Sequence, residues 1–299
     1  MLEGEGPQAE YRFMYTVAIV NPRAGRRETI QIPSATEILE TRSPGHAIQL
    51  TRDAIRRGAR TIMAVGGDGT INEVVNGFFE EEQLIATDTE LAVIAKGTGS
   101  DFSRSLNRAV PSGERRMIDV MKVRYTAIDG VRPSRYSINV TSFGIGAEVA
   151  ARVKRPAKGF GGRMAYLAGT LRTALSYSGQ FVTIELNNRE TIEEKILNVA
   201  VGNGQYQGAG MRVCPGAILD DGLFDVTVIR DISLGELARG LGQLYGGGIY
   251  SHPKVQAYRV NRLRAASEES VLVEIDGESV GKLPIEISIV PKAIRVWMP

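Results

Sequence analysis

Residues 66–77 read GGDGTINEVVNG and follow directly on the apolar run TIMAV at 61–65. The pattern predicts a buried strand that ends in a glycine turn and opens a helix over 71–79. Glycines let backbone N–H groups approach phosphate oxygens, and the start of a helix favours negative charge. The acid Asp68 would repel phosphate unless a divalent cation lay between them. The stretch therefore suggests a nucleotide polyphosphate with Mg²⁺ and phosphoryl transfer, although a strand, turn and helix with one acid is also ordinary α/β structure.

Composition bounds the class of protein. The chain has 299 residues, 43% of them hydrophobic and 23% charged, which suggests a globular protein of about two domains. A net charge of +2 gives no indication of nucleic acid binding. The single cysteine, Cys214, excludes a disulfide framework and predicts a small buried apolar side chain. No apolar run has transmembrane length and the acidic N-terminus is unlike a signal peptide, so we expect a cytoplasmic protein.

The order of expected elements divides the chain in two. Strands at 15–20, 37–41, 61–65 and 90–95 alternate with helices at 44–57 and 71–79, which predicts a doubly wound parallel α/β domain over 1–132. Ligands of such sheets bind beyond the carboxyl ends of the strands. From residue 133 to 299 we expect a mostly antiparallel β domain, with a cleft between the two domains. Its strand runs are 136–140, 181–186, 196–201, 224–229, 258–263, 271–275 and 285–290, with helices near 162–177 and 234–244.

One connection is too short for the predicted winding. A parallel crossover needs a dozen or more residues, usually a helix. Residues 26–36 contain Pro33 and no clear apolar stripe. We therefore expect an irregular loop, or a gap in the native numbering, between Gly25 and Glu37.

Several spaced motifs point to one family. They are NPRAG at 21–25, TRSPGHA at 41–47, GGDGTINEVVNG at 66–77, KGTGSDFSRSL at 96–106, SFGIGAEV at 142–149, VGNGQYQGAGMRVCPGAILDDGLFDV at 201–226 and VEIDGESVGKLPIEISIVPKAIRV at 273–296. Together they resemble the diacylglycerol kinase catalytic-domain family, which includes bacterial lipid kinases and is related to sphingosine, ceramide and NAD kinases. Lys96 and Ser100 depart from the family's usual residues in the fourth motif.

The resemblance implies a fold and a reaction. It implies an NAD kinase-like α/β domain followed by an antiparallel β-sandwich domain, and transfer of the γ-phosphoryl group of ATP to the hydroxyl of diacylglycerol or a related lipid alcohol. It also implies peripheral contact with a membrane, and it is compatible with a homodimer. The residues that it assigns to the nucleotide are Asn21, Pro22, Arg23, Ala24, Gly25, Thr41, Gly66, Gly67, Asp68, Gly69, Thr70, Ile71, Asn72 and Thr98.

The catalytic residues follow from the same resemblance. Asp-Gly at 276–277 is by local sequence a hairpin turn. The family pattern instead makes Glu278 the general base for the lipid hydroxyl, supported by Asp276. A hydroxyl is a poor nucleophile at neutral pH, so a positioned base helps it to attack. We assign Asp68 and Asp101, on two neighbouring loops, to water-mediated contact with Mg²⁺.

A second acidic turn, Asp220-Asp221-Gly222, carries an expected structural cation site. By local sequence it is a β-turn. The family pattern uses Asp221 together with the backbone carbonyls of Ile218 and Leu223 to hold Mg²⁺ or Ca²⁺, both of which accept oxygen ligands.

A basic stretch offers two interpretations. Arg152, Lys154, Arg155, Lys158 and Arg163 lie close together without an intervening acid. Such a run is usually a solvated loop. Alternatively, it attracts anionic lipid head groups.

Two other functions remain open at this stage. An NAD kinase relative shares GGDGT but does not supply NPRAG or the terminal DGE. A non-catalytic lipid- or nucleotide-binding module would be expected to lack Asp68, Glu278 or the loop of Thr98, and all are present.

Overall fold

The computed structural model describes residues 15–24, 35–96, 100–152, 169–170 and 172–299. Residues 25–34 of the short connection, Thr98 and half of the helix expected near 162–177 lie outside these residues, as do the basic residues from 154 to 163. Arg152 is described and pairs with Glu148 at 3.4 Å.

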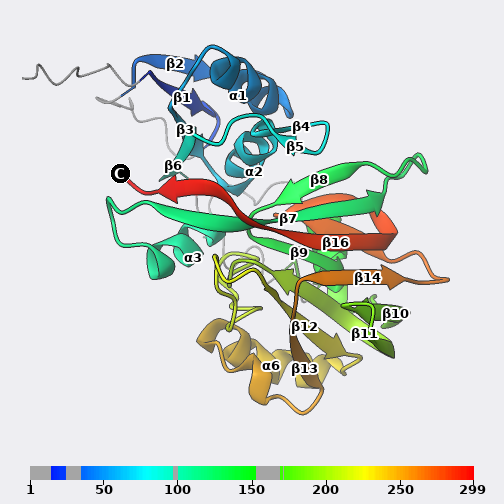
Figure 1. Cartoon of the computed structure of the whole chain (residues 1–299). Coiled ribbons are helices and arrows are strands. Elements are labelled where there is room, and N and C mark those ends of the chain that lie inside the picture. The colour runs from blue at the N-terminus through cyan, green and yellow to red at the C-terminus, as the bar shows by residue number, and fades with distance from the viewer. Residues whose placement is uncertain (1–14, 25–34, 97–99, 153–168, 171) are drawn as a thin grey trace, which may run out of the picture.

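The first part of the chain alternates strands and helices around a parallel sheet (Figure 1). The strands lie in the order β2-β1-β3-β6, and every neighbouring pair is parallel. All six residues of β3 are buried, as expected for a parallel strand covered on both faces. The elements are β1 Thr16–Val20, β2 Glu37–Glu40, α1 His46–Arg56, β3 Thr61–Gly66, α2 Asp68–Gly77, β4 Phe79–Glu80, β5 Gln83–Leu84, β6 Glu90–Ala95 and α3 Asp101–Ala109.

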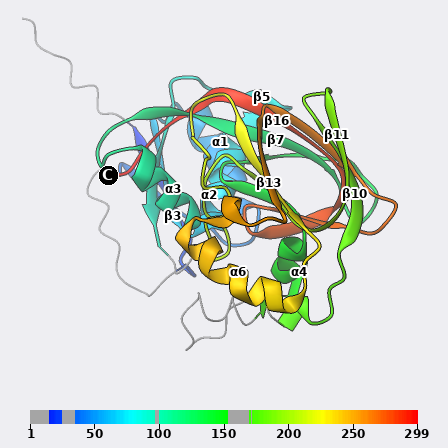
Figure 2. The same ribbon diagram turned by 90° about the horizontal axis from the view of Figure 1, so that it is seen from below.

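The rest of the chain is mostly antiparallel. The pairings β16-β15-β9-β11-β10-β14 return to β16, so two layers of strands enclose a second core, and α4 and α6 lie at one side of them (Figure 2). The elements are β7 Arg116–Thr126, β8 Ser134–Ser137, β9 Val140–Gly144, α4 Ile145–Arg152, β10 Gln180–Leu186, β11 Glu190–Gly202, β12 Phe224–Arg230, α6 Leu234–Gly246, the 3₁₀ turn Ile249–Ser251, β13 Val255–Val260, β14 Arg262–Ala266, β15 Leu272–Ile275 and β16 Glu278–Trp297. The predicted fold class is confirmed.

The last strand joins the two parts of the molecule. β16 pairs with β7 and β14 in the antiparallel layers, and its end at Arg295–Trp297 pairs in parallel with β6. Its register against β7 shifts between Val290 and Ile294. Such bulges bend a strand, which lets one strand serve two sheets. The predicted boundary at residue 132 falls between β7 and β8, and this division stays a prediction.

Two predicted strands are each divided in the structure. The run 258–263 was expected to be continuous, but β13 ends at Val260 and β14 begins at Arg262 with different partner strands. The side chain of Asn187 accepts the N–H groups of Asn261 and Arg262 at this break. The run 136–140 is likewise divided between β8 and β9. The second break matters for the site, because it turns backbone amides toward an acid.

Candidate active site

The glycine turn lies where β3 ends and α2 begins. A Cβ at Gly66 would lie 2.5 Å from Thr70 Oγ1, so only glycine fits there. The side-chain amide of Asn21, just after β1, donates to Thr70 Oγ1 at 3.2 Å. The predicted loops after β1 and β3 are therefore side by side at the carboxyl end of the parallel sheet.

Asp68 and Asp101 lie together on neighbouring loops. The Asp68 carboxylate accepts the backbone N–H groups of Asp101 at 3.1 Å and Phe102 at 3.2 Å, so it caps the start of α3. Burial raises the pKa of Asp68 above its usual range. Burial, together with the neighbouring Asp68 charge, raises the pKa of Asp101 to about 7. Two buried acids in contact with each other are stabilised by a proton or by a cation.

The residues present fit a catalytic divalent cation at this pair. One oxygen of Asp101, Oδ2, accepts the Ala209 N–H at 2.9 Å. The other, Oδ1, is buried without a hydrogen-bond partner, and Arg104 Nε is 3.8 Å away. A hard cation prefers carboxylate oxygens of this kind. Both oxygens of Asp68 retain a second lone pair beyond their amide bonds.

Asp276 is the most fully satisfied acid of the site. Its carboxylate accepts the N–H groups of Ile138, Asn139 and Val140 at 2.9 to 3.1 Å. It also accepts Ser137 Oγ and the side-chain amide of Asn72, both at 2.7 Å. The break between β8 and β9 supplies the three amides. Burial raises the pKa of Asp276, and these donors oppose that shift. Asp276 therefore holds the two domains together rather than facing a substrate.

The surroundings of Glu278 differ from those of Asp276, although only Gly277 separates the two in sequence. Its side chain is 46% exposed, and Arg135 Nη2 lies 2.6 Å from its Oε2. A Cβ added at Gly69 would lie only 3.4 Å from Glu278 Oε1, so the carboxylate rests against the glycine turn. Arg135 also donates to Asn72 Oδ1, at 2.6 Å from Nη2 and 3.1 Å from Nε. Arg135 and Glu278, which are 143 positions apart in the sequence, are thus joined by an ion pair beside the glycine turn.

Two cavities meet at Glu278. The smaller, of about 370 Å³, is lined by residues after β1, β2 and β3. The larger, of about 860 Å³, lies between the β4–β5 region and the β7–β8 hairpin. Glu278 lines both. Predicted nucleotide residues that line the smaller cavity are Asn21, Arg23, Ala24, Thr41, Gly67, Gly69 and Thr70.

Five described nucleotide residues line neither cavity: Gly66 and Asp68 within the glycine turn, and three more that lie elsewhere. Pro22 is exposed and does not line either of these cavities. The Ile71 side chain is fully buried in the first core. Asn72 is buried, and its amide binds Tyr136 O, Asp276 and Arg135. We therefore expect Asn72 to position Asp276 and Arg135 rather than to bind the nucleotide. Both the nitrogen and the oxygen of its side-chain amide already have hydrogen-bond partners.

At the second acidic turn, an arginine pairs with the acid that was expected to hold a structural cation. Asp221 forms an ion pair with Arg259, and its Oδ1 accepts the Leu223 N–H at 3.0 Å. Arg259 Nε also lies 3.2 Å from buried Asp225, which accepts the Tyr250 hydroxyl at 2.9 Å. A guanidinium therefore contacts the carboxylate that the resemblance assigns to a cation, and the cation site at Asp221 with the carbonyls of Ile218 and Leu223 stays a prediction.

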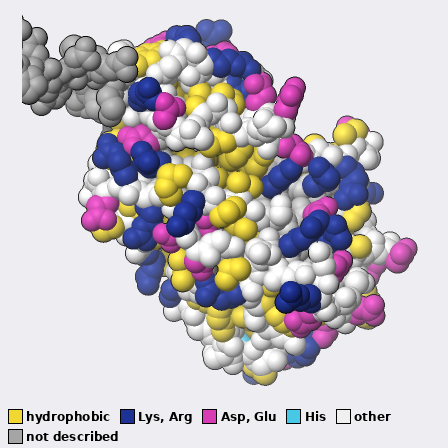
Figure 3. All heavy atoms as spheres, in the orientation of Figure 1, with side chains coloured by type: hydrophobic (Ala, Val, Ile, Leu, Met, Phe, Trp, Pro, Cys, Tyr) yellow, Lys and Arg dark blue, Asp and Glu magenta, His cyan; other side chains and the backbone are white. Residues whose placement is uncertain are grey.

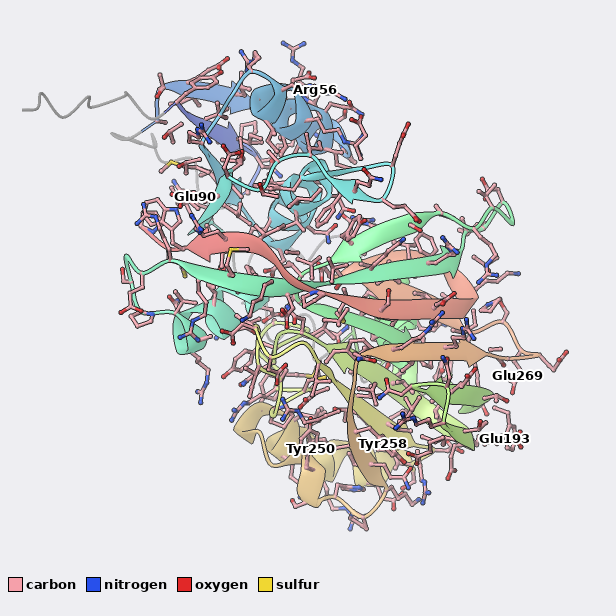
Figure 4. The ribbon with its side chains drawn as sticks, in the orientation of Figure 1. Arg56, Glu90, Glu193, Tyr250, Tyr258 and Glu269 are labelled. Atoms are coloured by element: carbon pink, nitrogen blue, oxygen red, sulfur yellow. The ribbon has the colours of Figure 1, made fainter. Side chains whose placement is uncertain are left out.

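The position of this turn also separates it from the glycine turn. Neither cavity beside Glu278 is lined by residues 218–223. Figure 4 shows Tyr250, the partner of Asp225, at the far end of the second domain from Arg56 on α1. The turn therefore contributes to the second domain and not to the site at Glu278.

Family models match both parts of the chain. Residues 16–132 match the diacylglycerol kinase catalytic domain. Residues 139–298, more than half of the chain, match the YegS C-terminal NAD kinase beta sandwich-like domain. The chain belongs to the diacylglycerol kinase-like, YegS-like lipid kinase family. The resemblance inferred from the spaced motifs is confirmed.

Relatives and a solved structure agree with this family. A probable lipid kinase YegS-like protein of Xanthomonas oryzae pv. oryzae (strain MAFF 311018) is 29% identical over 283 residues, 92% of this chain and 89% of the relative. A diacylglycerol kinase of Staphylococcus carnosus is 28% identical and covers 88% of this chain and 85% of its own. The crystal structure of a diacylglycerol kinase from Bacillus anthracis str. Sterne has a TM-score of 0.65 at 20% identity, over 95% of this chain and 96% of that one, and supports the fold.

Sequence reasoning missed three residues of the site. Arg135 lies in an unremarkable strand and has no local signal for its contact with Glu278. Glu73 lies within the quoted glycine stretch, and its carboxylate accepts the N–H groups of Gly45 and Ala47 at the start of α1. Glu274 is buried and accepts Ser142 Oγ at 2.9 Å and the Gln207 side chain at 2.8 Å. Burial raises its pKa to about 7. The only available signal for it was its position two residues before Asp276, at the end of a strand run.

Proposed function

We propose that this chain transfers the γ-phosphoryl group of ATP to the hydroxyl of a lipid alcohol, with diacylglycerol or a related lipid as the first candidate. The observation that carries the proposal is the position of Glu278. It rests against the glycine turn and lines two cavities, one suited to a nucleotide and one open to a second substrate. A base between two substrates is what a hydroxyl acceptor requires.

Each residue then has a part in the reaction. Backbone N–H groups of the turn at Gly67 and Gly69 approach the phosphates, and the start of α2 favours their charge. Glu278 accepts the proton of the acceptor hydroxyl as the hydroxyl oxygen attacks the γ-phosphorus. The bond from that phosphorus to the β–γ bridging oxygen breaks, and ADP leaves with the bridging oxygen. Arg135 orients Glu278 and adds positive charge beside the transferred group. Asp276 fixes the segment that carries Glu278.

Asp68 and Asp101 would hold Mg²⁺ by the fit described above. When bound, Mg²⁺ neutralises charge on the phosphate oxygens. Because ATP is a cytoplasmic substrate and the acceptor is a lipid, the proposal includes action at the cytoplasmic face of a membrane, by peripheral contact. Among the described helices, none has the length and apolar character needed to cross a bilayer.

The test is a transfer assay with γ-labelled ATP and Mg²⁺. The acceptors are diacylglycerol, phosphatidylglycerol, a sphingoid base, ceramide and a polyprenol, with NAD as a separate acceptor. We expect label in at least one lipid and none in NAD. Label in NAD alone would show an NAD kinase, and no transfer to any acceptor with ATP bound would favour a binding module.

A further inference from the structure

A protruding hairpin carries apolar side chains that the proposed mechanism does not use. The hairpin tip, residues 127–132, joins β7 to β8 (Figure 1). Ile128 is 90% exposed and Val131 is 59% exposed. No other described large apolar side chain is as exposed as Ile128. Burial of such a side chain is favourable, so a residue held this far out in water suggests a partner.

Three backbone amides of the hairpin tip have partners within the tip. The N–H of Ala127 donates to Val131 O at 2.8 Å, and the N–H of Gly130 donates to Ala127 O at 3.0 Å. The N–H of Val131 donates to Asp129 Oδ1 at 3.1 Å, and Gly130 adopts φ 84. Amides without water must find partners within the protein. These three amides therefore keep their partners when the tip leaves water.

Positive side chains lie behind the apolar tip. Arg132 is exposed, and Lys282 is exposed on β16 opposite Thr126 of β7. Neither forms an ion pair with any described residue, whereas Arg124 is paired with Glu82. Figure 3 shows a hydrophobic group at the end of the right-hand protrusion, with Lys and Arg side chains gathered below it. Apolar groups outermost and cations behind them match the order of acyl chains and phosphates in an anionic bilayer.

The hairpin also forms a wall of the larger cavity. Arg124, Tyr125, Ser134 and Arg135 line that cavity from the hairpin, and Glu278 lines it from β16. A membrane at the tip would therefore lie next to the cavity that leads to Glu278. A protein partner would need a concave surface to receive a narrow convex tip, while a bilayer receives it without one.

We propose that the β7–β8 hairpin tip inserts Ile128 and Val131 into an anionic lipid surface, with Arg132 and Lys282 at the phosphates. The identity of this partner rests on the proposed lipid kinase function. The tip docks the protein so that the larger cavity opens at the membrane surface.

The experiment is sedimentation of the full chain, without nucleotide, with vesicles of equimolar phosphatidylglycerol and phosphatidylcholine. Ile128→Asp should lower the affinity at least about tenfold, because a charge replaces an apolar side chain at the interface. Arg132→Glu and Lys282→Glu should weaken binding several-fold, and added salt should reduce that difference. Phe181→Asp is the matched control, since Phe181 is 64% exposed on β10 and away from the hairpin. It should bind as the wild type does.

The outcomes separate this inference from the proposed function. Equal binding by wild type and Ile128→Asp would overturn it, as would no binding by the wild type, or an equal loss in Phe181→Asp. Loss of a dimer in Ile128→Asp with unchanged vesicle binding would assign the tip to a second copy of the chain. Hairpin-dependent vesicle binding without phosphorylation of any lipid would support the membrane-binding tip and contradict the proposed lipid kinase reaction. For an active enzyme, Ile128→Asp should keep turnover of a water-soluble short-chain diacylglycerol and lose turnover in vesicles.

Discussion

The two acidic turns of the second domain share a local sequence and differ in their surroundings. Asp276-Gly277-Glu278 and Asp220-Asp221-Gly222 both follow or precede β runs, and each is by itself a common turn. The first brings Asp276 to five donors and Glu278 to the glycine turn. The second ends in an ion pair with Arg259. The difference shows that the topology around an Asp-Gly turn, and not the turn, makes a site.

The largest difference in stability should come from the two aspartates. Asp276→Ala leaves the Ser137 hydroxyl, one side-chain N–H of Asn72 and three backbone amides without their acceptor in a buried place. It should cost about 3–5 kcal/mol of the free energy of unfolding. Asp221→Ala removes a partly exposed ion pair and should cost about 1 kcal/mol or less. Urea denaturation of both variants measures the contrast. Similar losses would mean that the two turns are equivalent in the fold.

The next effect concerns the metal beside the glycine turn. Asp101→Asn removes a charge that faces the proposed Mg²⁺, and should weaken Mg²⁺-dependent ATP binding about tenfold, with little effect on binding without Mg²⁺. Calorimetric titration with and without Mg²⁺ measures this. Asp221→Asn is the control and should change neither titration. Equal weakening with and without Mg²⁺ would remove Asp101 from the metal site.

Buried acids near the Asp276–Glu278 turn should also make the free energy of unfolding depend on pH. Glu274 has a pKa of about 7 in the folded protein, above the ordinary 4.5. A raised folded pKa means that stability is fully present below the ordinary value and is lost as pH rises through about 7. Glu274→Gln keeps the acceptor oxygen for Gln207 and removes the charge. The variant should lose less stability than the wild type between pH 5 and 8, by on the order of 2 kcal/mol in the free energy of unfolding. Denaturation at each pH measures this difference. An unchanged decline would assign it to other groups, with Asp101 the first of them.

The smallest effect is expected from chelation. Because Arg259 forms an ion pair with the Asp221 carboxylate, EDTA should leave the melting temperature of the nucleotide-free protein unchanged. Arg259→Ala should lower it, because buried Asp225 loses a charged partner. Differential scanning calorimetry with and without EDTA checks both. A drop in wild-type melting temperature with EDTA, restored by Ca²⁺ or Mg²⁺, would show that a cation binds where the structure has a guanidinium.

Much of the glycine turn between β3 and α2 could be predicted from the sequence, because its signals are local. An apolar run, glycines and Asp68 fix a strand, a turn and the start of α2 within a dozen residues. The surroundings of Glu278 could not be predicted in this way. Arg135 reaches it from 143 residues away, and the break between β8 and β9 exists because three amides turn to Asp276. The ion pair of Asp221 with Arg259, 38 positions away, is likewise long-range and has no local signal in the sequence.

The central claim is that Glu278 is the base of a lipid kinase. Its most direct test is lipid phosphorylation by Glu278→Gln, measured beside titrated ATP binding. The amide keeps the shape but cannot take the proton, so turnover should fall about 10²–10⁴-fold while the dissociation constant of ATP stays close to the wild-type value. Lipid phosphorylation at the wild-type rate by Glu278→Gln would contradict the account.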